Sequence, residues 1–149
     1  MNTIRAATPE DFAAVCRLLT ESGLVHEDLT PARMTGFVVV PVQEGSASLV
    51  AVAGVETFPD AGEGLLRSVA VAPALRGHGT GADLVSTVER RAGTLGLRRL
   101  WLLTTTAPGF FRRQGYVDTP RAEAPAAVQQ SGEFKSLCPA SAVCLSKPL

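Results

Sequence analysis

The chain has 149 residues, of which 46% are hydrophobic and 19% are charged, and its 14 basic side chains balance its 14 acidic ones. This composition predicts a single folded domain over residues 1–149 and argues against general disorder. A net charge of zero argues against counterion-driven binding to nucleic acid or to an anionic membrane. Because no apolar stretch matches a secretory leader or a spanning helix, we expect a cytoplasmic protein without a membrane partner.

The N-terminal half predicts a strand, a helix and then an antiparallel meander. Thr8 and Pro9 are typical of a helix start, and Gly23 is a suitable stop. Apolar spacing within that helix places Cys16 in the core. Runs of β-branched residues follow, separated by turns rich in glycine, proline and aspartate. The expected strands cover residues 2–6, 37–42, 49–57 and 65–71.

The second half predicts a change from antiparallel to parallel pairing. Pro73 ends a strand, a glycine-rich loop follows, and an apolar stripe that includes Leu95 marks a long helix closed by Gly96. Another strand covers 99–104, a short helix 109–114, and a final apolar run 140–145. Since a strand, a crossover helix and a strand give a parallel pair, we expect an α/β (α+β) fold with a mixed, mostly antiparallel sheet flanked by helices.

The loop from Arg76 to Gly81 carries the clearest chemical signal. Its alternating glycines permit positive φ angles and leave backbone N–H groups uncovered, which makes a nest for anions. The following helix adds the positive end of its dipole, and Arg76 adds a guanidinium. A pyrophosphate is therefore the expected ligand, whereas glycines that serve only a tight turn are the simpler alternative.

Two other nucleotide motifs do not fit this loop. A dinucleotide-binding fingerprint follows the first strand of repeated parallel units and has an acid about 20 residues later. Here a meander precedes the loop, and the strand around Trp101 has no such acid. A phosphate-binding loop of the Walker type would require a lysine, which is missing.

Residues 69–81 and 110–116 together resemble the GNAT superfamily of N-acetyltransferases. The first segment has the arginine and glycine spacing of its coenzyme-binding motif, and the second has its short aromatic helix ending in glycine and an aromatic residue. The resemblance implies a splayed parallel strand pair that binds acetyl-CoA as cosubstrate. The residues expected to contact the coenzyme are Val69, Ala70, Val71, Arg76, Gly77, His78, Gly79, Thr80, Gly81, Phe110, Phe111 and Arg113.

Segments 66–71, 103–106 and 133–142 extend the resemblance to the arsenic-resistance N-acetyltransferases, which are similar in pattern to N-acetylglutamate synthases. This branch implies acetylation of the amino group of a small amino acid, including a glutamate mimic that carries an arsenic or phosphorus acid group. The alternatives are biosynthetic acetylation of glutamate, a coenzyme-binding sensor without turnover, and acetylation of protein lysines or N-termini.

The candidate catalytic residues are Glu56 and Cys138. An amine of pKa near 10 is mostly protonated at neutral pH and needs a base. Glu56 lies near the end of the expected strand 49–57, which precedes the strand 65–71 that the resemblance assigns to the coenzyme. The alternative is an exposed glutamate with a structural role. Phe111 occupies the position at which many members of the superfamily have a tyrosine that protonates the departing coenzyme thiolate. Cys138, Ser136 and Ser141 are other donors. Direct transfer needs no cysteine nucleophile, so Cys138 either lines the substrate site or packs as a small apolar residue.

Arg67 is the main candidate for substrate binding. An arginine in an apolar strand needs an anionic partner, either a substrate carboxylate or an acid of the chain such as Glu21 or Glu123. We also assign Ser68, Thr104, Thr105 and Ser141 to the substrate site, although strand propensity and helix capping explain the threonines as well.

The cysteine and histidine pattern predicts neither disulfides nor a metal. Cys16, Cys138 and Cys144 are odd in number and irregularly spaced, and His26 and His78 complete no zinc-binding spacing. A homodimer is expected if the closing strand forms a free sheet edge.

Overall fold

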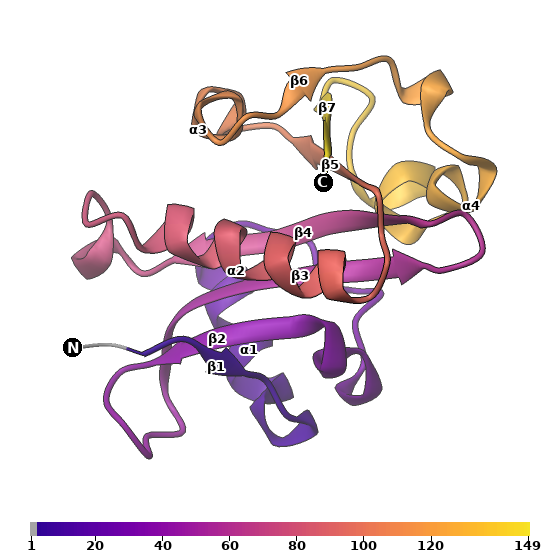
Figure 1. Ribbon diagram of the computed structural model, residues 1–149. Helices are drawn as coiled ribbons and strands as arrows, with labels where there is room; N and C mark the ends of the chain where they lie inside the picture. The colour runs from indigo at the N-terminus through magenta and orange to yellow at the C-terminus, as the bar shows by residue number, and fades with distance from the viewer. Residues whose placement is uncertain (1–2) are drawn as a thin grey trace. The chain divides into compact units, whose positions relative to one another are not determined.

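The computed structural model describes residues 3–149, which fall into two compact units. Unit 1 contains the chain up to Val55 together with Ser68–Val88, and unit 2 contains Glu56–Arg67 and Glu89–Leu149. Figure 1 traces the chain by colour from one end to the other. Strands β3 (Leu49–Phe58) and β4 (Glu63–Val71) and helix α2 (Thr80–Thr94) each contribute residues to both units. The prediction of a single domain stays a prediction.

Unit 1 is built on the predicted antiparallel hairpin. Strand β2 (Phe37–Pro41) pairs with the first part of β3 on one side and with the short strand β1 (Arg5–Ala6) on the other. Gly54 lies opposite Phe37, and a Cβ there would come within 2.5 Å of the phenyl ring. Phe37 therefore fills the space that the missing side chain leaves. The predicted strand began at Asn2, which lies outside the described residues.

Helix α1 (Phe12–Glu21) follows a 3₁₀ turn over Pro9–Asp11, as the cap and proline predicted. Gly23, with φ of 70°, reverses the chain after the helix. Cys16, predicted to be a core residue, is only partly buried. The core of unit 1 consists of Ala7, Val15, Leu18, Leu19, Leu29, Met34, Phe37, Val39, Val52 and Ala70.

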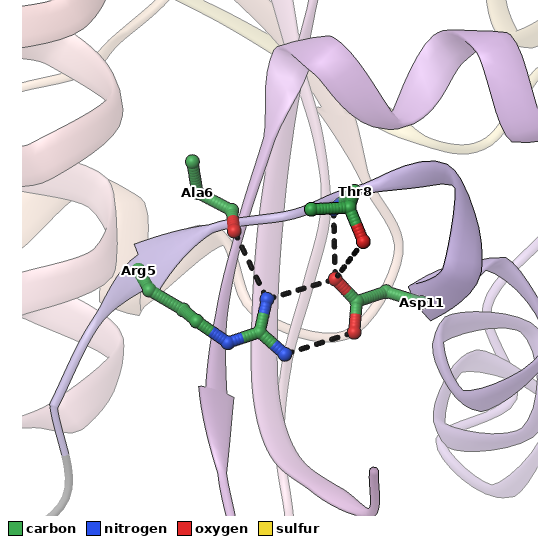
Figure 2. Close-up of polar contacts among 4 residues, drawn as sticks. All are labelled: Arg5, Ala6, Thr8 and Asp11. Carbon is green, nitrogen blue, oxygen red and sulfur yellow. Dashed lines mark hydrogen bonds and ion pairs between the residues drawn. The ribbon is translucent and has the colours of Figure 1, made fainter. Parts of the chain in front are cut away.

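A buried carboxylate fixes the entry into α1 (Figure 2). Arg5 donates two hydrogen bonds to Asp11, of 2.8 and 2.9 Å, and the backbone N–H of Thr8 donates a third at 2.8 Å. The hydrogen bonds from Arg5, supported by that from Thr8, hold the pKa of Asp11 below its ordinary value. Strand β1 and the helix start are thus joined through one side chain.

In unit 2, strand β5 (Arg99–Thr104) lies between β4 and β7 (Val143–Pro148), and the two later strands run side by side in Figure 1. The parallel ladder with β4 joins Glu63–Leu65 to Arg99–Trp101, whereas the antiparallel ladder with β7 follows β5 along its whole length. Strand β5 therefore continues beyond its three pairs with β4. Trp101 is buried here and donates from its indole N–H to Glu63 at 2.6 Å.

Strand β6 (Val117–Asp118) pairs with the outer side of β7, so β7 is an interior strand. Over the described residues the strand order is β1-β2-β3-β4-β5-β7-β6, a mixed sheet as predicted. The prediction that the closing strand forms a free sheet edge, on which the expected homodimer depended, is therefore wrong. The homodimer itself stays a prediction.

The remaining helices are short. They are α3 (Pro108–Arg113), α4 (Ala126–Gln129) and a π-helical turn over Glu133–Leu137 that the sequence did not predict, together with 3₁₀ helices over Pro31–Gly36, Pro73–Leu75 and Arg121–Glu123. Leu95, predicted to be buried, is 67% exposed, because α2 ends at Thr94 and Gly96 turns the chain with φ of 83°. Among residues 3–149, no helix has the length and apolarity needed to cross a bilayer.

Candidate functional site

The predicted anion-binding loop connects β4 to α2 within unit 1. Gly77 and Gly79 have φ angles of 84° and 80°, in the left-handed region that favours glycine. A Cβ at either position would meet no atom within 4 Å. The conformation, rather than a lack of space, therefore requires glycine here.

Helix α2 begins directly after this loop. Its first turn includes a hydrogen bond from the N–H of Asp83 to the carbonyl of Gly79, at 3.1 Å. The first N–H groups of an α-helix have no partner inside the helix, and these belong to Thr80, Gly81 and Ala82. Residues 76–79 are exposed at this helix start. The geometry suits an anion of two or more charges.

The side chain of Arg76 braces the loop. Its Nε donates to the carbonyl of Val71, the last residue of β4, at 3.0 Å. This contact uses one of the five N–H donors of the guanidinium. Arg76 therefore ties the loop to the end of β4, whereas His78 is an exposed loop residue.

Strand β4 has a backbone irregularity just before the loop. Ser68 has φ of 59°, and among residues 3–149 it is the sole non-glycine residue with positive φ. Holding such a residue in this region costs about 1–2 kcal/mol, and such strain concentrates at functional sites. Ser68 and Ala70 are buried, while Val69 and Val71 are partly exposed. The irregularity breaks the regular alternation of β4 at the segment expected to contact the coenzyme.

Arg67, the neighbour of Ser68, lies in a buried charge cluster of unit 2. Its side chain is 1% exposed, with Nη1 3.6 Å from Oε1 of Glu56 and Nη2 3.4 Å from Oε2 of Glu133. Glu133 is 6% exposed and Glu56 18%. The structure thus brings together two residues that the sequence singled out, Arg67 and Glu56. The contacts it shows for Arg67 are with acids of the chain, and a contact with a substrate carboxylate stays a prediction.

Glu133 is the member of this cluster that sequence reasoning missed. It stands in the π-helical turn, and its carbonyl accepts a hydrogen bond from the N–H of Cys138 at 3.1 Å. The signal that could have found it was an acid in a segment already singled out by its resemblance, beside the apolar Phe134. Cys138 is partly buried, and Ser141, also predicted to lie in the substrate site, is exposed.

The aromatic helix α3 packs as a unit with the residues that follow it. Phe111 is buried and meets the rings of Phe110 and Tyr116 edge to face, at centroid distances of 4.9 and 6.1 Å. The hydroxyl of Tyr116 donates to Glu89 at 2.9 Å, and Lys147 donates to the same oxygen at 3.0 Å.

Burial and the Glu89 carboxylate raise the pKa of Tyr116 far above its ordinary value. Because its hydroxyl donates to Glu89, this tyrosine is a structural residue and a poor proton donor.

The remaining predicted site residues occupy the end of β5 and α3. The Oγ1 of Thr104 accepts a hydrogen bond from the N–H of Ala107, the N-cap residue of α3, at 3.1 Å, so this threonine holds the loop before the helix without capping its first turn. Thr105 and Arg113 are exposed. No group of three or more potential metal-ligating side chains occurs within residues 3–149.

Comparisons with known proteins agree with this geometry. A model of the acetyltransferase (GNAT) family matches residues 7–116. Amino-acid acetyltransferases of Pseudomonas syringae pv. syringae and Azotobacter vinelandii are each 31% identical to the chain, over 119 and 130 residues. These alignments cover 76% and 83% of the chain but 27% and 29% of the relatives, so the chain spans less than a third of the length of these curated relatives.

Solved structures show the same fold. N-acetylglutamate synthase from Neisseria gonorrhoeae, complexed with coenzyme A and N-acetyl-glutamate, superposes with a TM-score of 0.83 at 22% identity, over 100% of this chain and 35% of that one. Rv2747 from Mycobacterium tuberculosis, also solved with CoA, gives 0.78 at 23% identity over 99% of both chains. The family match, the sheet order and the loop geometry lead to one conclusion: the chain belongs to the acetyltransferase (GNAT) family.

Proposed function

We propose that this protein transfers an acetyl group from acetyl-CoA directly to the amino group of a small amino acid. The observation that carries the proposal is the loop after β4, where two glycines with positive φ lead into the start of α2 beside Arg76. Support for the coenzyme comes from family membership and from the CoA-bound neighbours.

The coenzyme's diphosphate would bind the N–H groups of the loop and the first turn of α2, with Arg76 as the nearest charged donor. Backbone groups of Val69–Val71 would bind the pantetheine amides and polarise the acetyl carbonyl. Phe110, Phe111 and Arg113 of α3 complete the proposed coenzyme contacts.

Glu56 is the proposed general base. The ammonium group of the acceptor gives one proton to Glu56, directly or through water, and the neutral nitrogen attacks the acetyl carbon while the carbon–sulfur bond breaks; the second proton leaves the nitrogen to solvent as the amide forms. The sulfur leaves with the electron pair of that bond as a thiolate, which is tolerable because a thiol has a pKa of about 8.5. Since Phe111 has no proton to give and Tyr116 donates to Glu89, no dedicated acid is assigned.

The acceptor class follows from the relatives. The proteins of Pseudomonas syringae and Azotobacter vinelandii are amino-acid acetyltransferases, and a structural neighbour contains N-acetyl-glutamate, so an α-amino acid is the proposed acceptor. Arg67, Ser68, Thr104, Thr105 and Ser141 are the proposed acceptor-site residues. A glutamate mimic bearing an arsenic or phosphorus acid belongs to the same class and rests on the resemblance of residues 133–142.

The test is release of free thiol when the protein is mixed with acetyl-CoA and one candidate amine at a time. We expect release, with a matching acetylated product by mass spectrometry, for at least one α-amino acid in a panel that includes glutamate, glutamine and the phosphorus mimic. Coenzyme binding without release for any member would instead favour the sensor, and release only with peptides would favour protein acetylation.

A further inference from the structure

Helix α3, which carries the proposed coenzyme contacts Phe110 and Phe111, depends on residues outside itself for its position. It has six residues, too few for its own hydrogen bonds to stabilise it. Within unit 2, Phe111 packs edge to face on the buried ring of Tyr116. The place of α3 is therefore set by what fixes Tyr116 and the end of the helix.

Lys147 makes three contacts at that end. Its Nζ donates to the carbonyl of Gln114, the C-cap residue of α3, at 2.8 Å and to Oε2 of Glu89 at 3.0 Å. The hydroxyl of Tyr116 donates to the same oxygen of Glu89 at 2.9 Å. The ammonium also lies 5.5 Å from the centre of the Tyr116 ring, within the range of a cation–π contact. One side chain thus binds both the end of α3 and the tyrosine that packs on it.

The lysine itself comes from the interior of the sheet. Lys147 lies on β7 opposite Leu100 of β5, and β7 has strands on both sides. Its side chain passes close to Gly115, where an added Cβ would come within 3.2 Å of it. Glu89 and Lys147 are 17% and 27% exposed, so water screens their ion pair less than a pair on the open surface. These contacts connect the end of a short helix to a strand held by two neighbours.

We propose that Lys147 is a positioning residue for the coenzyme: by fixing the end of α3, it holds the ring of Phe110 in place for the pantetheine arm of acetyl-CoA. This inference rests on the proposed function, which assigns α3 to the coenzyme. Phe110 is partly exposed, and an apolar ring suits the pantetheine chain better than the charged diphosphate. A helix that is already fixed avoids the ordering cost of binding, so Lys147 acts on affinity through the helix.

The experiment compares acetyl-CoA with ADP, which carries a diphosphate without the pantetheine arm. Calorimetry gives the affinity of both ligands for the wild type and for Lys147→Met, which keeps most of the side-chain stem and removes the ammonium. We expect Lys147→Met to bind acetyl-CoA about tenfold more weakly and to bind ADP as the wild type does. In turnover, the KM for acetyl-CoA should rise by a similar factor while kcat stays nearly unchanged. A merely structural role would weaken both ligands alike or neither.

Lys135→Met is the matched control, because Lys135 is exposed, and both affinities should keep their wild-type values. If Lys147→Met does not fold, Tyr116→Phe decides the question, since it keeps the ring and removes the hydroxyl that binds Glu89. This variant should weaken acetyl-CoA binding by about threefold and leave ADP binding unchanged.

An unchanged affinity for acetyl-CoA in the folded variant, or an equal loss for ADP, would overturn the inference while leaving coenzyme binding by the wild type intact. A wild type that binds no acetyl-CoA would overturn the proposed function itself, and the inference with it.

Discussion

The loop over residues 76–81 and the cluster around Arg67 use charge in opposite ways. The loop is exposed and offers backbone N–H groups at a helix start, so an anion there finds donors whose orientation the chain has already fixed. The cluster is buried and consists of ion-paired side chains that come from two strands and a distant turn. Recognition by backbone tolerates many side chains, whereas recognition by a buried cluster depends on each charge in it.

The largest effect is expected from breaking the cluster. Arg67→Ala would remove the guanidinium that is ion-paired with the buried Glu133 and with Glu56, which should lower the free energy of unfolding by about 3–5 kcal/mol. Urea denaturation at pH 7 measures this. Arg113→Ala, which removes an exposed arginine, is the control and should change little. Equal stability of the two variants would show that the cluster is not a coupled ionic unit.

The loop should respond in ligand affinity rather than in stability alone. Gly79→Ala places a Cβ at φ of 80° and should reduce acetyl-CoA affinity by about tenfold or more, because the N–H groups must turn away from the anion. Gly45→Ala is closely matched, with φ of 79° and equally open space. Both variants should lose similar stability, and calorimetry should show weakened binding for Gly79→Ala alone. Equal affinity in the two variants would count against the loop.

These two regions also differ in how far the sequence revealed them. The glycines, the arginine and the flanking strand and helix of the loop are adjacent in the chain, so local conformational rules predicted their geometry. The hairpin and the parallel crossover were predictable for the same reason, since alternation and apolar spacing report local structure.

The cluster was only half predictable. The sequence predicted that Arg67, an arginine in an apolar strand, has an anionic partner. It did not predict Glu133, because this residue is distant in the chain and lies in a π-helical turn that leaves no periodic pattern. The position of β7 inside the sheet was missed for a related reason, because the two-residue strand β6 is too short to leave an alternating pattern.

The contact between Arg5 and Asp11 is a more exposed arginine–carboxylate pair with which the Arg67 cluster can be compared. Asp11 is hydrogen-bonded by a half-exposed Arg5 and by Thr8, so Asp11→Asn should destabilise the protein by about 1–2 kcal/mol at pH 7, less than breaking the buried cluster.

The sign with pH follows from the lowered pKa of Asp11. Its stabilisation is complete above the ordinary carboxyl pKa, near 4, and is lost as pH falls through the lower value in the folded protein. The wild type and Asp11→Asn should therefore converge in stability in acid. A difference that stays constant down to pH 2 would contradict this assignment.

The smallest effect is expected for the reactivity of Cys144, a buried residue in the core of unit 2. Burial raises the pKa of Cys144 to about 11, so its thiolate is scarce at pH 8. Alkylation followed by mass spectrometry should modify Cys144 much more slowly than a free thiol of ordinary pKa, and the rate should rise steeply once the protein is denatured. Rapid modification in the folded state would mean that this part of unit 2 opens readily.

The central claim is that the loop over residues 76–81 binds the diphosphate of acetyl-CoA, and calorimetry with two ligands tests it most directly. Acetyl-pantetheine carries the same thioester without the diphosphate and nucleotide. Our account predicts measurable affinity for acetyl-CoA and an affinity for acetyl-pantetheine lower by about a hundredfold or more. Equal affinities, or no binding of acetyl-CoA at all, would contradict it.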